Sequence, residues 1–238
     1  MTVTLPHRHP LAAITSFLFV LLLGGGAQAG SQEQEAQDLI DNSRTTLETV
    51  LAIEDMTWLR ENIGRARGVI IFPQVIKGGF IFGGSGGSGV MLARKDDSND
   101  WSDPAFYTIG AVTFGLQIGA EASQVLMLVM TERGLASLLT SQANLGTGLS
   151  IAAGPVGAGA KAATADIVQY NLSKGAFGGV TLDGAVIKVR NGLNSAFYGS
   201  DVRPTDILIT REARNATAGD LVKSVTDAAA GESEDESE

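Results

Sequence analysis

The sequence predicts an α+β fold in which N-terminal helices pack on a curved, mainly antiparallel β-sheet whose curl extends toward a barrel-like shape. Three observations lead to this prediction. A helical apolar pattern covers residues 32–53, short apolar runs separated by turn residues cover residues 69–209, and glycine makes up 30 of the 238 residues. The glycines lack the collagen period of three, so they indicate tight turns, bulges and bends in a sheet.

The first 29 residues predict a secretory signal. Arg8 supplies a positive charge, Leu11–Leu23 is an apolar run, and Ala27-Gln28-Ala29 places small residues where a signal peptidase cleaves. The run is shorter than the ~20 residues that cross a bilayer, and an uncleaved membrane anchor is the alternative. We therefore expect an exported bacterial protein, periplasmic or extracellular, with association with a membrane left open.

The first helix of the expected domain covers residues 32–53, and its acidic polar face favours packing on the domain over direct contact with a membrane. A second short helix is expected to end near Ile63, with Asp55 or Thr57 as its N-cap and Gly64 as its C-terminal stop. The apolar face of the first helix consists of Ala36, Ile40, Leu47, Val50 and Leu51.

The β-rich region follows at residues 65–210, with one helix expected at residues 132–140 and an ambiguous Gly/Ala-rich stretch at residues 145–165. A last helix is expected at residues 217–229 with Thr217 as its cap, followed by an acidic tail. We thus divide the chain into a signal (1–29), one domain (30–212) and a C-terminal helix with tail (213–238). The expected strands are Val69–Phe72, Gly79–Phe82, Val90–Ala93, Phe106–Ile109, Val125–Met130, Val186–Val189 and Ile207–Ile209.

A weak internal repeat suggests two related β units at residues 70–107 and 167–198. Lys77-Gly78-Gly79-Phe80 recurs as Lys174-Gly175-Ala176-Phe177, and Ala105-Phe106-Tyr107 is echoed by Ala196-Phe197-Tyr198. Chance similarity between glycine-rich hairpins is the alternative.

Charge and residue inventory exclude several function classes. The chain has 26 acidic and 17 basic residues, no cysteine, and two histidines that both lie in the predicted signal. Catalysis by a histidine-activated nucleophile and the common zinc sites are therefore excluded from the mature chain, and we expect no cofactor. The negative charge also disfavours nucleic acid and unselective adsorption to anionic lipid.

Two motifs in the sequence are candidate binding sites. The run Gly84–Gly89 satisfies the G-x-G-x-x-G pattern, but a strand-like run rather than a helix follows it, so a bulge in a sheet is favoured over a dinucleotide site. The basic residues Arg60, Arg65, Arg67 and Lys77 are candidates for contact with a headgroup phosphate, and ordinary surface charge is the alternative. The isolated acids Glu121, Asp166 and Asp183 are expected in structural roles.

Several segments, taken in order, resemble the SYLF domain family over residues 33–210. Lys77 lies inside one of them. The segments are Phe72-Pro73-Gln74-Val75, Lys77-Gly78-Gly79-Phe80, Gly83–Gly89, Trp101-Ser102-Asp103-Pro104-Ala105-Phe106-Tyr107, Gly115-Leu116-Gln117-Ile118-Gly119, Ala153-Gly154-Pro155-Val156-Gly157, Tyr170 with Ser173-Lys174-Gly175, and Phe177 with Gly184.

The resemblance implies a lipid-binding module, because eukaryotic relatives bind phosphoinositides and some bind actin. The predicted export signal leads us to expect lipid or membrane binding in the cell envelope and no actin binding. We expect no enzymatic activity. An envelope scaffold that binds a protein partner is the alternative, and a carboxylate-dependent enzyme ranks last because it needs two converging acids.

Overall fold

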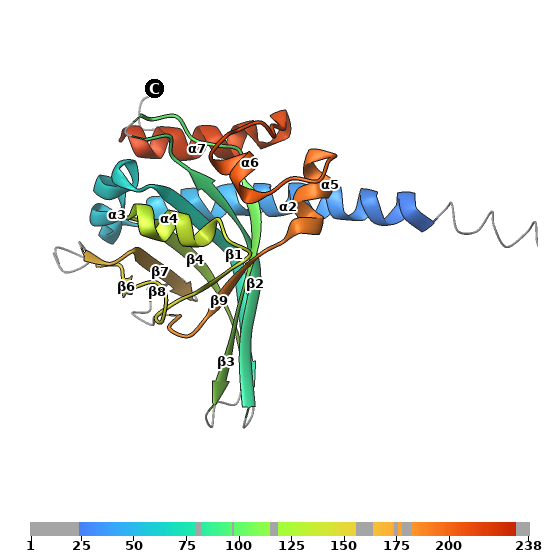
Figure 1. Cartoon of the computed structure of the whole chain (residues 1–238). Coiled ribbons are helices and arrows are strands. Elements are labelled where there is room, and N and C mark those ends of the chain that lie inside the picture. Colours follow the sequence, from blue (N-terminus) through green and yellow to red (C-terminus); the bar gives the residue numbers. More distant parts are fainter. Residues whose placement is uncertain are drawn as a thin grey trace, which may run out of the picture.

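One curled β-sheet with helices on both of its faces makes up the computed structural model, which describes residues 24–79, 82–96, 98–114, 119–155, 164–173, 176–177 and 182–231 (Figure 1). The nine strands within these ranges run in the order β5-β9-β3-β2-β1-β4-β7-β6, and β8 pairs with β7. All pairs are antiparallel except β6 with β7. The predicted α+β class and the mainly antiparallel sheet are confirmed. The strands are β1 (Gly68–Gly79), β2 (Phe82–Ala93), β3 (Ala105–Phe114), β4 (Gly119–Val129), β5 (Gln142–Asn144), β6 (Ile151–Ala153), β7 (Ile167–Ser173), β8 (Ala176–Phe177) and β9 (Val186–Val189).

The helices divide between the two faces of the sheet, and each face has its own apolar core. The first core lies under α2 and includes Ile40 and Leu47 together with Leu92 of β2. The second core lies under α4 and α6 and includes Met91 and Leu138. The helical segments are α2 (Gly24–Leu51), η1 (Glu54–Met56), α3 (Thr57–Asn62), η2 (Ile63–Arg65), α4 (Glu132–Leu138), α5 (Asn191–Tyr198), α6 (Pro204–Leu208), η4 (Ala216–Ala218) and α7 (Gly219–Ala230).

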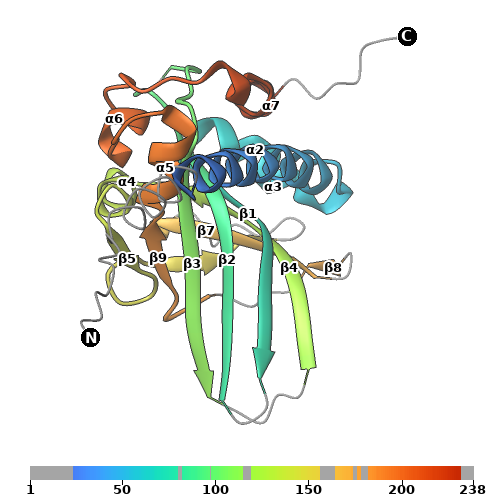
Figure 2. The same ribbon diagram turned by 90° about the vertical axis from the view of Figure 1, so that its right-hand side faces the viewer.

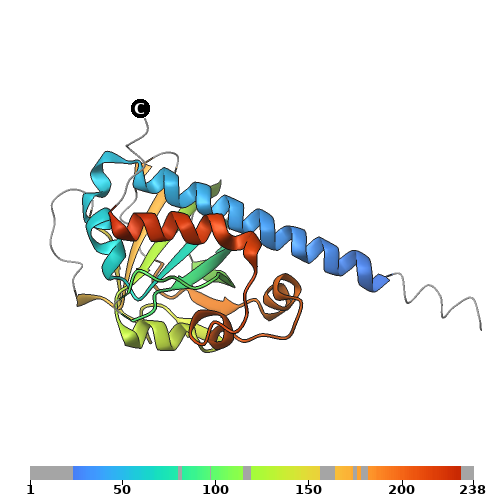
Figure 3. The same cartoon turned by 90° about the horizontal axis from the view of Figure 1, so that it is seen from above.

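Helix α2 packs on its own domain, since Ala36, Ile40, Leu47 and Val50 are all buried. Its N-terminal part extends past the sheet, and α7 lies beside its C-terminal part (Figure 3). None of the described helices has both the length and the apolar character that crossing a bilayer requires. The predicted signal falls outside the described residues up to residue 23, so its role stays a prediction.

The four long strands β1 to β4 extend well past the helices. Figure 2 shows α2 crossing the upper part of these strands, while their lower part continues with no helix over it. On the two flanks, β9 pairs with β3 only as far as Gly110, and β7 pairs with β4 only from Ser123 onward. The lower part is therefore a four-stranded sheet that projects from the rest of the fold.

A β-bulge interrupts β1 near Pro73. The register of β1 shifts against both neighbouring strands between Ile71 and Val75, so that β1 contains one residue more than β2 or β4 over this stretch. Proline lacks the N–H that a central strand donates, and a bulge is one of the places in a sheet that tolerates it. A Cβ added at Gly89, on the facing strand, would lie 2.3 Å from the Ile71 carbonyl oxygen, so only glycine fits this close approach.

The glycine run of β2 is thereby explained without a cofactor. It forms a strand opposite the bulge of β1, whereas a bulge was predicted within the run itself, and β2 continues to Ala93 with no helix after it.

Several expectations for individual elements are wrong. The N-cap of α3 is Met56, with no side-chain cap bond, and not Asp55 or Thr57. Residues Ile207–Ile209 end a short helix instead of forming a strand, because Pro204 occupies the first turn of α6 and Asp206 accepts a hydrogen bond from the Arg203 N–H. Gly64 does not stop a helix through a left-handed conformation. A Cβ there would lie 2.3 Å from the carbonyl oxygen of Ala229, so Gly64 permits the close contact between η2 and α7.

The N-terminus of the last helix also differs from the prediction. The side chain of Asn215 accepts a hydrogen bond from the Thr217 N–H, so the cap is Asn215 and not Thr217.

The predicted internal repeat is wrong as well. Residues 68–93 form the hairpin of β1 and β2, whereas β7 and β9 lie toward opposite ends of the sheet and do not pair. Ala105-Phe106-Tyr107 belongs to strand β3, but Ala196-Phe197-Tyr198 belongs to helix α5. The two segments share residue types without sharing a conformation.

Candidate functional site: the open face of the sheet

The candidate site is the uncovered part of the sheet surface on the α2 side, which we call the open face. Residues directly opposite one another in paired strands point to the same side of a sheet, so the strand register defines the members of this surface. Figure 2 views it directly, below α2. Its members are Gln74, Ile76, Gly78, Gly84, Gly86, Ser88, Thr108, Gly110, Val112, Ala122, Gln142, Asn144, Val186 and Lys188.

The open face is arranged in rows that become less polar with distance from α2. The nearest row crosses five strands and is polar, formed in order by Gln74, Ser88, Thr108, Lys188 and Gln142. The next row carries small or apolar side chains over four long strands and β9, formed by Ala122, Ile76, Gly86, Gly110 and Val186, and ends in the polar Asn144 on β5. A further row contains Gly78, Gly84 and Val112. The surface is thus amphipathic along the strand direction.

Two large apolar side chains are exposed on this surface. Ile76 is 52% exposed and Val112 is 74% exposed. Ile209, after α6, is the one other large hydrophobic residue of the described chain that is similarly exposed, at 47%. Exposed apolar side chains that gather on one surface are typical of a binding site, whereas scattered ones are ordinary.

A groove of about 520 Å³ lies on the open face where β9 and β5 meet β3. Its volume falls within the range of small-molecule sites. A second hollow of about 440 Å³ lies on the same face beside α2, with Thr49, Gln74, Ala122 and Leu172 in its wall. Its lining residues on the open face are Thr108, Gly110, Val112, Gln142, Val186 and Lys188. Gly184 also lines it, and at the free edge of β3 the lining includes Ser85, Ile109 and Ala111, which belong to the opposite face by register.

Lys188 supplies the positive charge of the groove. Its side chain is exposed and makes no hydrogen bond or ion pair with any residue in the described part of the chain. Arg190 comes directly after the end of β9. Its guanidinium lies 2.6 Å from a Glu35 carboxylate oxygen and donates to the Ser88 hydroxyl. The groove therefore offers one uncompensated cation beside neutral polar groups.

The four predicted headgroup residues are not gathered in one place. Arg60 donates to the backbone carbonyls of Leu51 and Ile53, both at 2.8 Å, and so closes the C-terminal end of α2. Arg67 forms an ion pair with Glu132 at 2.8 Å.

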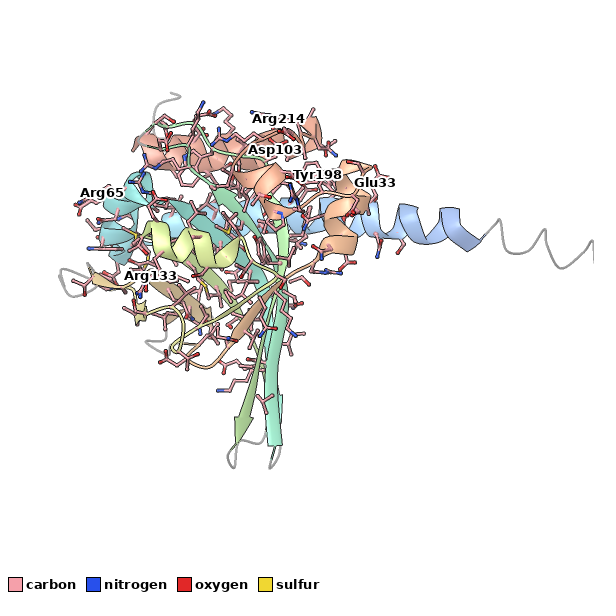
Figure 4. All side chains as sticks on the ribbon, viewed as in Figure 1. Glu33, Arg65, Asp103, Arg133, Tyr198 and Arg214 are labelled. Atoms are coloured by element: carbon pink, nitrogen blue, oxygen red, sulfur yellow. The ribbon has the colours of Figure 1, made fainter. Side chains whose placement is uncertain are left out.

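Arg65 is exposed and projects from the helix-bearing end, away from the lower part of the sheet (Figure 4). Lys77 lies nine residues beyond the start of β1, which corresponds to about 30 Å along the strand. It points to the face opposite the open face, in register with Glu121. The role of these four residues in headgroup binding stays a prediction.

The isolated acids occupy different settings. Asp166 is buried, and its carboxylate accepts hydrogen bonds from Thr131, Arg133 and Ser150. Burial by itself would raise the pKa of Asp166, but these hydrogen bonds outweigh it and hold the pKa well below its usual range. Glu121 and Asp183 are exposed.

The described residues that line the groove include no Asp or Glu. No cluster of three or more potential metal ligands occurs among the described residues.

The sequence did not single out the groove residues. Lys188 stands in the predicted strand Val186–Val189, where a charge between apolar neighbours marks the one side chain that faces solvent. That alternation was available as a signal. The pairing of β9 with both β3 and β5, which sets Lys188 between Thr108 and Gln142, joins segments far apart in the sequence and could not be foreseen.

Comparison with known proteins places these features in a family. Residues 110–228, half of the chain, match the family model Ysc84, described as Las17-binding protein actin regulator. An SH3 domain-containing protein of Schizosaccharomyces pombe is 34% identical over 66% of this chain and 38% of its own length. The human SH3 domain-containing YSC84-like protein 1 is 34% identical over 67% of this chain and 48% of its own length.

Protein YSC84 of Saccharomyces cerevisiae is also 34% identical, over 62% of this chain and 33% of its own length. The aligned part thus spans less than half of each of these relatives. The match over half of the chain, together with these identities, shows that the chain belongs to the Ysc84 family, the SYLF domain family that its motifs resemble.

Proposed function

We propose that this protein is a non-enzymatic lipid-binding protein of the cell envelope that takes phospholipid on the open face. The observation that carries the proposal is the open face itself, an uncovered surface with a polar row at one end and apolar rows beyond it. An amphipathic ligand has the same order, a polar headgroup followed by an apolar chain. The envelope location depends on the predicted export signal at residues 1–29.

The distribution of charge supports this choice of surface. The protein has a formal net charge of −9, which repels anionic membranes as a whole. The projecting parts of β1 to β4, residues 74–79, 82–88, 108–114 and 119–124, contain only Lys77 and Glu121 as charged residues. Both lie on the face opposite the open face. The projecting sheet can therefore approach a lipid surface without bringing carboxylates to it.

Apolar burial is large enough to drive such binding. Each buried methylene group contributes about 0.8 kcal/mol, and both Ile76 and Val112 are available to contact acyl chains. The glycines between these two residues carry no side chain and leave the surface flat. An acyl chain can therefore lie close to the backbone of the sheet there.

Vesicle co-sedimentation of the purified protein tests the proposal. We expect the protein to sediment with phospholipid vesicles at low salt, and native mass spectrometry of the purified protein to show bound lipid. Failure to bind both zwitterionic and anionic vesicles, with no co-purifying lipid, would refute it.

Binding of a protein partner is the second candidate, and the free strand edges favour it. Ala111–Phe114 of β3 pair with β2 on one side. On the other side, where β9 ends, they pair with no strand among the described residues. Such an edge can accept an added strand from another chain. The description of the matching family model names Las17 and actin, and nothing in the comparisons supports the expectation that actin binding is absent here. A stoichiometric protein partner, recovered by a protein that binds no vesicles, would favour this candidate.

A further inference from the structure

We infer that the groove at Lys188 selects a phospholipid that carries a single negative charge, with its phosphodiester against the Lys188 ammonium and an acyl chain on the glycine-rich rows of the open face. This inference rests on the proposed function and adds to it a headgroup class and a position.

The setting of Lys188 gives the headgroup site its position. Lys188 lies in register with Thr108 on one side and Gln142 on the other, at the polar end of the groove. The Gln142 side-chain amide donates to the Asn144 side chain at 3.3 Å and keeps a second N–H. The Thr108 hydroxyl donates to the Gly87 carbonyl, so it offers no donor to a ligand. One ammonium and one neutral amide therefore face the space where a phosphate would lie.

The surroundings limit the site to one negative charge. The next cation along the chain, Arg190, is held by both carboxylate oxygens of Glu35, at 2.6 and 3.3 Å. That carboxylate compensates the guanidinium, and it would repel a second phosphate placed beside Arg190. A headgroup with several phosphates would need a cluster of uncompensated cations, whereas the groove lining contains Lys188 as its one cation among the described residues.

The direction of the acyl chain follows from the rows. Val186 and Gly110 come directly after the Lys188 row, and Val112 with Gly84 come after them. These positions carry no charge and little side chain. A chain that starts at Lys188 thus runs along the strands toward the far end of the projecting sheet, with its polar end near α2.

The experiment compares vesicles of phosphatidylcholine with vesicles in which part of that lipid is replaced by phosphatidylglycerol, or by phosphatidylinositol bisphosphate at the same total charge. The proteins are the full-length wild type, Lys188→Gln, Lys188→Arg and the control Lys95→Gln. Lys95 is exposed in the connection after β2, at the other end of that strand from the projecting part, and its substitution changes the net charge by the same amount.

We expect the wild type to bind phosphatidylglycerol vesicles about 10-fold more tightly than phosphatidylcholine vesicles, the effect of one hydrogen-bonded ion pair of about 1.4 kcal/mol. Lys188→Gln should lose this preference and keep its binding to phosphatidylcholine. Lys188→Arg and Lys95→Gln should retain the preference. Phosphatidylinositol bisphosphate should give no gain over phosphatidylglycerol at matched charge.

The inference is overturned if Lys188→Gln keeps the full preference, if Lys95→Gln loses as much as Lys188→Gln, or if phosphatidylinositol bisphosphate is clearly favoured at matched charge. In each of these cases vesicle binding persists, so the proposed function stands. Absence of binding to every vesicle by the wild type overturns the proposed function and this inference together. Circular dichroism of each variant confirms that the fold is retained in the samples compared.

Discussion

Replacing the two exposed apolar side chains of the open face gives the most direct test of its role. Ile76→Ser combined with Val112→Ser removes most of the apolar side-chain surface that a lipid could cover there. Both residues lie on the projecting sheet and outside the two apolar cores, so the substitutions leave the interior unchanged.

The size of the effect follows from the exposed fractions. Full burial of an isoleucine or valine side chain contributes roughly 1.5–3 kcal/mol. With 52% of Ile76 and 74% of Val112 still exposed before binding, lipid contact gains about 1 kcal/mol from the first and about 1.5 kcal/mol from the second. Their joint loss, about 2–3 kcal/mol, corresponds to a decrease in vesicle affinity of roughly 50-fold.

Vesicle co-sedimentation against lipid concentration measures this decrease. Ile209→Ser serves as the matched control, because Ile209 is 47% exposed but lies after α6, away from the open face. We expect the control to bind vesicles as the wild type does, and all three proteins to unfold at similar temperatures. An unchanged affinity in the double variant, or an equal decrease in the control, would show that the open face is not the lipid-contacting surface.

Three further predictions concern the interior. Asp166→Asn should lower the free energy of unfolding by about 3 kcal/mol in urea denaturation, because an amide cannot accept all of the bonds from Thr131, Arg133 and Ser150. Because the pKa of Asp166 is lowered in the folded state, its carboxylate stabilises the fold above pH ~4, the ordinary pKa of an aspartate. This contribution is lost as the pH falls below that value. Acid should therefore destabilise the wild type more than Asp166→Asn. Gly89→Ala should destabilise by about 1–3 kcal/mol and lower the melting temperature, whereas Gly84→Ala, whose nearest contact is 3.4 Å away, should have little effect.

Local signals in the sequence identified much of the fold. Helix α2, the buried halves of the central strands and helix α4 follow from apolar patterns, which are strong where an element buries one face. The projecting halves of β1 to β4 carry no such pattern and were not predicted as strands. The apolar triplet Ile207–Ile209 was misassigned because three residues are too few to show a period, and Pro204 before it was the better signal. The repeat failed because shared glycines and aromatics do not fix strand pairing.

The candidate site was harder to foresee than the fold. The sequence favoured Arg60, Arg65, Arg67 and Lys77 because they are close in the chain, yet Arg60 and Arg67 are bound by groups of their own domain. Lys188 became a candidate only through its neighbours on β3 and β5. Long-range register decides which face a residue occupies, and no local pattern contains it.

The additional residue near Pro73 determines which side chains of β1 lie on the open face. Before it, Ile71 shares the α2 side of the sheet with Val90. After it, Ile76 shares that side with Gly86, so odd and even positions of β1 exchange sides between the two points. Were the strand regular, Val75 would stand opposite Gly86, where Ile76 now stands, and Lys77 would stand opposite Gly84. The bulge therefore keeps the ammonium of Lys77 off the open face.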